Sequence, residues 1–312
     1  ALIRTGDHRH ELIYTSHHIL MDGWSSSRML GEVLQRYAGQ VPARQGSQYR
    51  DYIHWLQGQD AGAGQRFWLE QLAAFDEPTR LAQALKGAAD GEGYGEYLED
   101  LDSGLTRRLG EFAREQRVTI NTLVQAAWLL LLQRYTGQSS VTFGATVAGR
   151  PADLPGIEEQ LGLFINTLPV VASPRSEQSV AAFVQQVQAQ NIALREFEHT
   201  PLYEVQRWAG WPGEALFDSI LVFENYPVSE ALQQAAPQGL VFGDVRTQEQ
   251  THYPLTLVVN TGERLSLRIS HDRSAFGVQA IGQLAAHFKQ LLAALIADPA
   301  RALGELVLPA QA

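Results

Sequence analysis

The segment of this sequence whose residue types are best suited to catalysis runs from residue 16 to residue 25 and reads SHHILMDGWS. Two adjacent histidines, His17 and His18, end a stretch that is typical of a strand, and Asp22 and Gly23 follow across a turn. A histidine fixed at a strand end can project into a cleft. Its unperturbed pKa of about 6.5 leaves it mostly neutral at physiological pH and able to accept a proton. Gly23 permits a tight turn or the close approach of a substrate. The segment therefore predicts a general base.

The two histidines are expected to differ in role, because successive side chains of a strand point to opposite faces. Only one of His17 and His18 can face a cleft, and the other is expected to be structural. Asp22 can either orient the histidine, as in a hydrolase triad, or hold the loop by pairing with an arginine. We favour the second role and name Arg150 as the partner, because a buried carboxylate needs a compensating charge. A solvated loop arginine is the alternative for Arg150.

Other chemistries find less support in the sequence. His8 and His10 precede the histidine pair and raise the possibility of a zinc site, but there is no HExxH motif, and a polar turn separates the two pairs. We therefore expect no metal. The absence of cysteine excludes disulfides, thiolate zinc sites and a cysteine nucleophile, so that any thioester must be carried by another molecule. The sequence also lacks the GxSxG motif of serine hydrolases and the GxxxxGK[ST] phosphate loop.

The charge balance limits the class of partner. The chain has 34 acidic and 24 basic residues and a net charge of −10, which disfavours nucleic acids and anionic membranes. Its longest apolar run, residues 126–132, is far shorter than the roughly 20 residues that span a bilayer. No basic region followed by an apolar segment opens the chain, and the expected location is the cytoplasm.

The elements that must position the histidines come from the first part of the chain. Residues 1–19 are predicted to form a hairpin, and residues 24–37 a helix with N-caps among residues 25–27. Residues 45–75 are predicted to be helical, with aromatic side chains that serve packing. The segment 86–95 is rich in glycine and lacks periodicity, which predicts a linker.

Beyond the linker, helical and strand patterns alternate, which indicates α/β layers. Strands are predicted at 141–147, 164–171, 217–223 and in a hairpin of 255–260 with 265–270, and helices at 106–116, 121–135, 180–197 and 275–296. Asn121 is expected to cap the second of these helices and Gly137 to end it. A length of 312 residues suggests two compact units, predicted as residues 1–85 and 96–312 on either side of the linker.

The sequence HHILMDG at residues 17–23 resembles the HHxxxDG signature of the condensation domains of nonribosomal peptide synthetases. A shorter HxxxD pattern also occurs in chloramphenicol acetyltransferase and other CoA-dependent acyltransferases of similar fold. Further segments resemble the family in the family's order: YRDYIHWL at 49–56, FGATVAGRPADLPGIEEQLGLFINTLPV at 143–170, EHTPLYEVQ at 198–206, LFDSILVFENYP at 216–227 and THYPLTLVV at 251–259. Their order makes the resemblance highly specific.

The resemblance implies an α/β fold with two chloramphenicol-acetyltransferase-like lobes that form a V, with His18 in a tunnel between two entrances. It implies amide bond formation between a donor thioester and an acceptor amine. Both would arrive on phosphopantetheine arms of upstream and downstream peptidyl carrier domains, beside an adenylation domain, and the domain itself would bind no cofactor. His18 can then act as a base, as a positioning group for the amine or as a stabiliser of the tetrahedral intermediate.

Three further expectations follow from the resemblance. Asn166, in the sequence FINT, either faces the tunnel and hydrogen-bonds a pantetheine or an intermediate, or caps a neighbouring backbone. The sequences DGWS and FINTLPV resemble the subtype that takes an L-configured donor. Family members carry a substantial segment before the histidine motif, so we expect the first lobe to be truncated here. A CoA-dependent acyltransferase and a non-catalytic platform that docks carrier domains stay open as alternatives.

Overall fold

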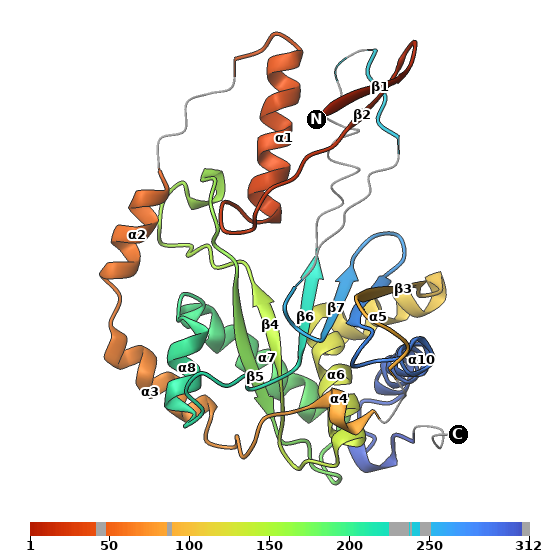
Figure 1. Cartoon of the computed structure of the whole chain (residues 1–312). Coiled ribbons are helices and arrows are strands. Elements are labelled where there is room, and N and C mark those ends of the chain that lie inside the picture. Colours follow the sequence, from red (N-terminus) through yellow and green to blue (C-terminus); the bar gives the residue numbers. More distant parts are fainter. Residues whose placement is uncertain (42–47, 86–88, 225–236, 238, 244–250, 308–312) are drawn as a thin grey trace. The chain divides into compact units, whose positions relative to one another are not determined.

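A computed structural model describes residues 1–41, 48–85, 89–224, 237, 239–243 and 251–307 (Figure 1). The chain divides into two compact units. Unit 1 consists of Ala1–Gly58, Arg150–Ile165 and Val228–Asp244, and unit 2 consists of Gln59–Gly149, Asn166–Pro227 and Val245–Ala312. Each unit therefore contains segments that are distant in the sequence.

Unit 1 begins with a two-stranded hairpin and continues with helices. Strand β1 (Leu2–Gly6) pairs antiparallel with β2 (Arg9–Leu12), which places Leu2 opposite Leu12. Helices α1 (Gly23–Tyr37) and α2 (Tyr49–Gln57) follow, and a short 3-10 helix, η1 (Ile157–Glu159), comes from the second segment. The hairpin is confirmed, but the expected strand up to the histidines is wrong. β2 ends at Leu12, where its register with β1 reaches Leu2, and residues 13–17 lie outside any strand.

Unit 2 is built on a six-stranded mixed sheet with the order β3-β8-β7-β6-β4-β5. The strands are β3 (Tyr94–Asp100), β4 (Val141–Val147), β5 (Asn166–Ala172), β6 (Ser219–Glu224), β7 (Leu255–Asn260) and β8 (Ser266–Asp272). Strand β6 is parallel to both of its neighbours, β4 and β7, and the other pairings are antiparallel. In Figure 1, β4, β5, β6 and β7 stand side by side, with α7 behind β4 and β5.

Helix α6 (Ile120–Thr136) is the centre of the core of unit 2. Its residues from Thr122 to Leu132 are all buried, as expected for a helix that is apolar on every side. It packs against α7 (Val180–Leu194) and α10 (Val278–Leu295) and against β4. The other helices among the described residues of unit 2 are α3 (Ala61–Gln71), α4 (Leu81–Ala84), α5 (Ser103–Glu115), α8 (Leu202–Trp208) and the 3-10 turns η2 (Arg195–Phe197) and η3 (Leu303–Glu305).

The α/β class and most predicted elements are confirmed, with corrections at the ends of two helices. The cap of α6 is Thr119, whose hydroxyl accepts the N–H of Thr122, and not Asn121. The cap of α1 is Asp22 and not one of the serines. Gly137 ends α6 in the left-handed conformation, with a φ of 72°, as predicted.

The division between the units differs from the predicted boundary at residues 86–95. Residues 59–85 belong to unit 2, because Trp68, Leu72 and Leu81 are buried in its core. Residues 94 and 95, placed in the linker, begin strand β3, which pairs with β8. Residues 86–88 of that segment lie outside the described residues. In the described part of the chain, no helix has the length and apolar character needed to cross a membrane.

Candidate functional site

Asp22 begins helix α1 and is the centre of a buried polar cluster in unit 1. Its side chain is 1% exposed. Oδ1 accepts the N–H of Ser25 at 2.8 Å, which satisfies a free donor at the helix start. Oδ2 accepts the N–H of Phe164 at 3.1 Å. The carboxylate thus joins α1 to a loop that lies 142 residues further along the chain.

Arg150 supplies the compensating charge that the sequence predicted. Its Nη2 lies 3.2 Å from Oδ1 and 3.4 Å from Oδ2 of Asp22, and the arginine side chain is only 6% exposed. Nη1 donates to the carbonyls of Ile157 and Gln160 at 2.6 and 3.1 Å. The guanidinium carbon lies 4.0 Å from the ring centroid of Phe164, a cation–π contact. The alternative of a solvated loop arginine is therefore wrong.

The loop that receives these contacts spans residues 157–164. Besides its bonds to Asp22 and Arg150, the loop accepts the indole N–H of Trp24 at the Glu158 carbonyl, 3.0 Å away. Tyr52, Ile157 and Phe164 form a small buried apolar cluster in the same unit. The aromatic side chains of α2 therefore serve packing, as predicted.

His17 and His18 lie outside any strand, just before and in a turn over residues 18–20. Nδ1 of His17 accepts the N–H of Ile19 at 3.0 Å, and the His17 carbonyl accepts the N–H of Leu20 at 3.0 Å. His17 thus holds the turn. The imidazole of His18 is exposed and has no hydrogen-bond partner among the described residues.

The contacts of the cluster decide between the two roles that the sequence left open for Asp22. A carboxylate offers about four lone-pair sites, and four contacts from Ser25, Phe164 and Arg150 occupy those of Asp22. The acid therefore holds the backbone that follows the His18 turn and does not orient the imidazole as a triad acid would. Gly23 is the first residue of α1, and an added Cβ would meet no atom within 4 Å. No tight turn requires this glycine. The role that stays proposed for Gly23 is to leave space for the close approach of a substrate.

Asn166, at the start of β5 in unit 2, has its amide engaged with backbone. Nδ2 donates to the carbonyls of Glu198 and Thr200 at 2.8 and 2.7 Å, and Oδ1 accepts the N–H of Thr167 at 2.9 Å. The structure therefore favours the capping alternative for Asn166. Burial raises the pKa of the nearby Glu198 carboxyl, which also accepts the N–H of Gly149.

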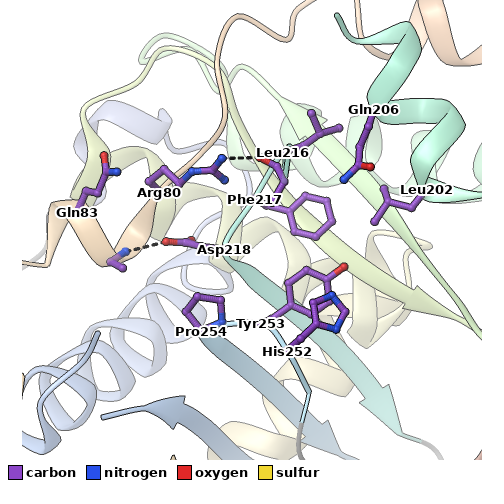
Figure 2. A pocket seen from close by; sticks show the side chains of 12 residues that line it. Arg80, Gln83, Leu202, Gln206, Leu216, Phe217, Asp218, His252, Tyr253 and Pro254 are labelled. Carbon is purple, nitrogen blue, oxygen red and sulfur yellow. Dashed lines mark hydrogen bonds between the residues drawn. The ribbon is translucent and has the colours of Figure 1, made fainter. Parts of the chain in front are cut away.

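A cavity of about 390 Å³ lies in unit 2 where α4, α8 and the chain before β6 and β7 meet (Figure 2). Figure 2 shows Asp218 and Arg80 at its edge. Asp218 accepts the N–H groups of Leu81 and Ala82 at 3.0 and 2.9 Å, and burial raises the pKa of its carboxyl. Arg80 donates to the Ala215 carbonyl. Both charged groups thus bond the start of α4 to the segment of residues 215–218. Sequence reasoning missed this structural role.

Comparisons with known proteins agree with this picture. The family model described as Condensation domain matches residues 1–312. One component protein of the linear gramicidin synthase of Brevibacillus parabrevis is 40% identical over 315 residues, which cover 98% of this chain and 4% of that protein. Chondramide synthase cmdD of Chondromyces crocatus is 39% identical over 304 residues, which cover 96% of this chain and 8% of that protein. The chain therefore spans a small part of these relatives.

Solved structures show the same fold. The X-domain from teicoplanin biosynthesis has a TM-score of 0.77 at 22% identity, over 94% of this chain and 70% of that one. The first condensation domain of the CDA synthetase has a TM-score of 0.74 at 22% identity, over 93% of this chain and 65% of that one.

Proposed function

The chain belongs to the condensation-domain family, and from this premise we propose that it forms amide bonds within a nonribosomal peptide synthetase. The observation that carries the proposal is that His18 is exposed on a turn and that the chain just after this turn is held by the buried pair of Asp22 and Arg150. A fixed backbone beside an exposed imidazole supports this role, because a general base must be held within hydrogen-bond reach of the proton that it accepts.

The proposed reaction joins a donor acyl thioester to an acceptor amine. The amine nitrogen attacks the thioester carbonyl carbon, a C–N bond forms, the C–S bond breaks, and the donor thiol leaves. The amine nitrogen loses one proton and the departing thiolate gains one, and His18 is the group proposed to accept the amine proton, to orient the amine or to stabilise the oxyanion intermediate. Holding two tethered reactants in register supplies a further part of the rate enhancement.

The proposed substrates are carried on phosphopantetheine arms of carrier domains, since a chain without cysteine cannot form the thioester itself. The proposed partners are therefore the upstream and downstream peptidyl carrier domains and the adjacent adenylation domain. The sequences DGWS at residues 22–25 and FINTLPV at 164–170 support an L-configured donor. Relatives whose names are synthases of linear gramicidin and chondramide support a peptide product.

The test is an amide-forming assay with two loaded carrier domains, followed by mass spectrometry. His18→Ala is expected to reduce product formation by about 10²–10⁴-fold while the fold survives. His17→Ala, the matched control in the same turn, is expected to be milder. Near-wild-type product from the His18 variant would contradict the assignment.

Two further arms of the assay separate the alternatives. Product from acyl-CoA alone, without a donor carrier domain, would identify a CoA-dependent acyltransferase. Binding of carrier domains without any turnover would identify a docking platform.

A further inference from the structure

Ser25 makes a second connection between helix α1 and the loop of residues 157–164. Its side chain is fully buried. The hydroxyl donates to the Gly162 carbonyl at 2.9 Å and accepts the Gly162 N–H at 3.1 Å and Nη2 of Arg150 at 2.9 Å. A hydroxyl has one donor and two acceptor sites, so these three bonds use its whole capacity. Ser25 therefore fixes one loop peptide and the guanidinium together.

The loop is also confined on its other side, by Tyr49 of α2. An added Cβ on Gly162 would lie 2.2 Å from Cδ2 of the Tyr49 ring, so only glycine fits there. The Tyr49 hydroxyl donates to the Leu163 carbonyl at 2.8 Å, and its ring lies against Phe164 with 5.2 Å between centroids. The backbone of Gly162 is thus held between Ser25 and Tyr49.

The same peptide is bonded to the chain that follows His18. The Gly162 carbonyl accepts the backbone N–H of Asp22 at 3.1 Å in addition to the Ser25 hydroxyl. A displacement of Gly162 therefore moves the backbone of Asp22, which lies four residues after His18 and closes the segment that begins with the His18 turn. The ion pair of Asp22 and Arg150 does not bond the Gly162 peptide directly, whereas the Ser25 hydroxyl bonds both Gly162 and Arg150.

We propose that Ser25 is a positioning residue for the amide-forming reaction, which acts through Gly162 and Asp22 to place the His18 turn. The inference rests on the proposed function, because the reaction that it serves is the one proposed above. It concerns the orientation of His18 and not the contacts of substrates. The expected signature is therefore a fall in kcat with little change in KM.

The first test is Ser25→Ala in this chain with two loaded carrier domains. The single-turnover rate is expected to fall roughly 10- to 100-fold at unchanged KM for both carriers, because small errors of placement cost rate. Ser25→Thr keeps the hydroxyl and is expected to recover most of the rate. Ser27→Ala is the matched control, since Ser27 donates to the Gly23 carbonyl within the same helix. A Ser25→Ala protein with a lower Tm and a wild-type rate would overturn the proposal.

A second measurement does not depend on activity. The imidazole signals of His18 in an NMR titration are expected to change in Ser25→Ala and to stay unchanged in Ser27→Ala, whereas those of His271 in unit 2 stay unchanged in both. His18 signals identical to wild type in Ser25→Ala would overturn the inference. If the wild-type protein forms no amide, the proposed function fails, and this titration still decides whether Ser25 positions His18.

A third test uses the crowding around Gly162. Gly162→Ala forces its new methyl group against the Tyr49 ring and is expected to change the His18 signals and to reduce the rate. Tyr49→Ala removes that ring, so the same Gly162 substitution made in a Tyr49→Ala background is expected to cause a smaller further change. An equal effect of Gly162→Ala in both backgrounds would show that the loop peptide is not held as proposed.

Discussion

Unit 1 joins its distant segments mainly with buried polar side chains, whereas unit 2 joins its segments mainly through a large apolar core, beside buried polar contacts such as those of Asp218 with Leu81 and Ala82. In unit 1, Asp22, Ser25 and Arg150 connect α1 to a loop more than 120 residues away, and the apolar cluster of that unit has three buried members among the described residues. In unit 2, Trp128 and its neighbours on α6 lie in an extensive apolar core.

The difference has a physical consequence. Hydrogen bonds and ion pairs are directional, so a few of them can fix a turn in one geometry, but the loss of one partner leaves another buried and unpaired. Apolar contacts are spread over many side chains and tolerate small changes better. Unit 1 is therefore suited to hold a precise site and unit 2 to be a stable scaffold. Four predictions test this comparison.

The largest effect is expected from breaking the pair of Asp22 and Arg150. Asp22→Ala or Arg150→Ala leaves an uncompensated buried charge, which costs about 3–5 kcal/mol, and the double variant should lose less than the sum. Hydrogen exchange is expected to show lost protection in α1 and retained protection in α6. Asp7→Ala is the control, since the pair of Arg4 and Asp7 is exposed and should contribute little. Equal loss of protection in both helices would contradict separate units.

A smaller effect is expected in the sheet of unit 2 from Gly144→Ala. Its new Cβ would lie 2.4 Å from the Phe217 ring and 2.7 Å from Cγ2 of Thr167, so the strands must shift at a cost of roughly 1–3 kcal/mol. Gly110→Ala on α5 is the matched control, because nothing lies within 4 Å and alanine favours a helix. Denaturant unfolding measures both. A neutral Gly144 variant would show that this sheet yields more easily than its packing indicates.

Acid is expected to weaken unit 2 through two buried histidines. Burial lowers the pKa of His271 and of His287, which are 1% and 5% exposed. The unfolded chain, with a histidine pKa of about 6.5, therefore binds more protons than the folded chain as the pH falls through that value, and stability is lost on acidification. The denaturation midpoint should be lower at pH 5.5 than at pH 7.5. His271→Leu with His287→Leu should reduce this difference, and His8→Leu in the exposed hairpin is the control. A slope unchanged by the double substitution would contradict this assignment.

The smallest effect on stability is expected from Gly23→Ala. The added methyl group meets nothing within 4 Å, and the first position of a helix accepts alanine, so the free energy of unfolding should change by less than about 1 kcal/mol. If a substrate approaches this surface, amide formation should nevertheless fall, which separates use in catalysis from use in folding. A wild-type rate would remove Gly23 from the proposed site.

Elements whose patterns reflect burial could be predicted from the sequence. The sequence predicts strand β4 at residues 141–147 because its residues are small or apolar, and most of them are buried in the strand between β6 and β5. Strand β3 was missed, because this edge strand carries charged residues and exposes Leu98, its one aliphatic side chain, on the solvent side. Its pattern therefore lacks the apolar alternation that marks a half-buried strand.

The site could be predicted only as far as side-chain chemistry requires. A buried carboxylate needs a cation, and this requirement predicts Arg150 as the partner of Asp22 although the two residues are 128 positions apart in the sequence. The bonds from Ser25 to Gly162 use a backbone peptide, and no residue type marks a peptide that will be bound in this way. The boundary between the units failed for a related reason. The segment of residues 150–165 belongs to unit 1, although the segments before and after it in the sequence belong to unit 2. Its composition does not indicate this assignment.

The separation of Asp22 from Arg150 in the sequence also determines when their ion pair can form during synthesis on the ribosome. The two residues are 128 positions apart, so at roughly 5–20 residues per second the nascent chain carries an uncompensated Asp22 for on the order of 10 s before its partner is made. During that interval helix α1 can form but cannot be locked to the loop of residues 157–164. Codon choice between residues 22 and 164 is therefore expected to influence the yield of correctly assembled unit 1.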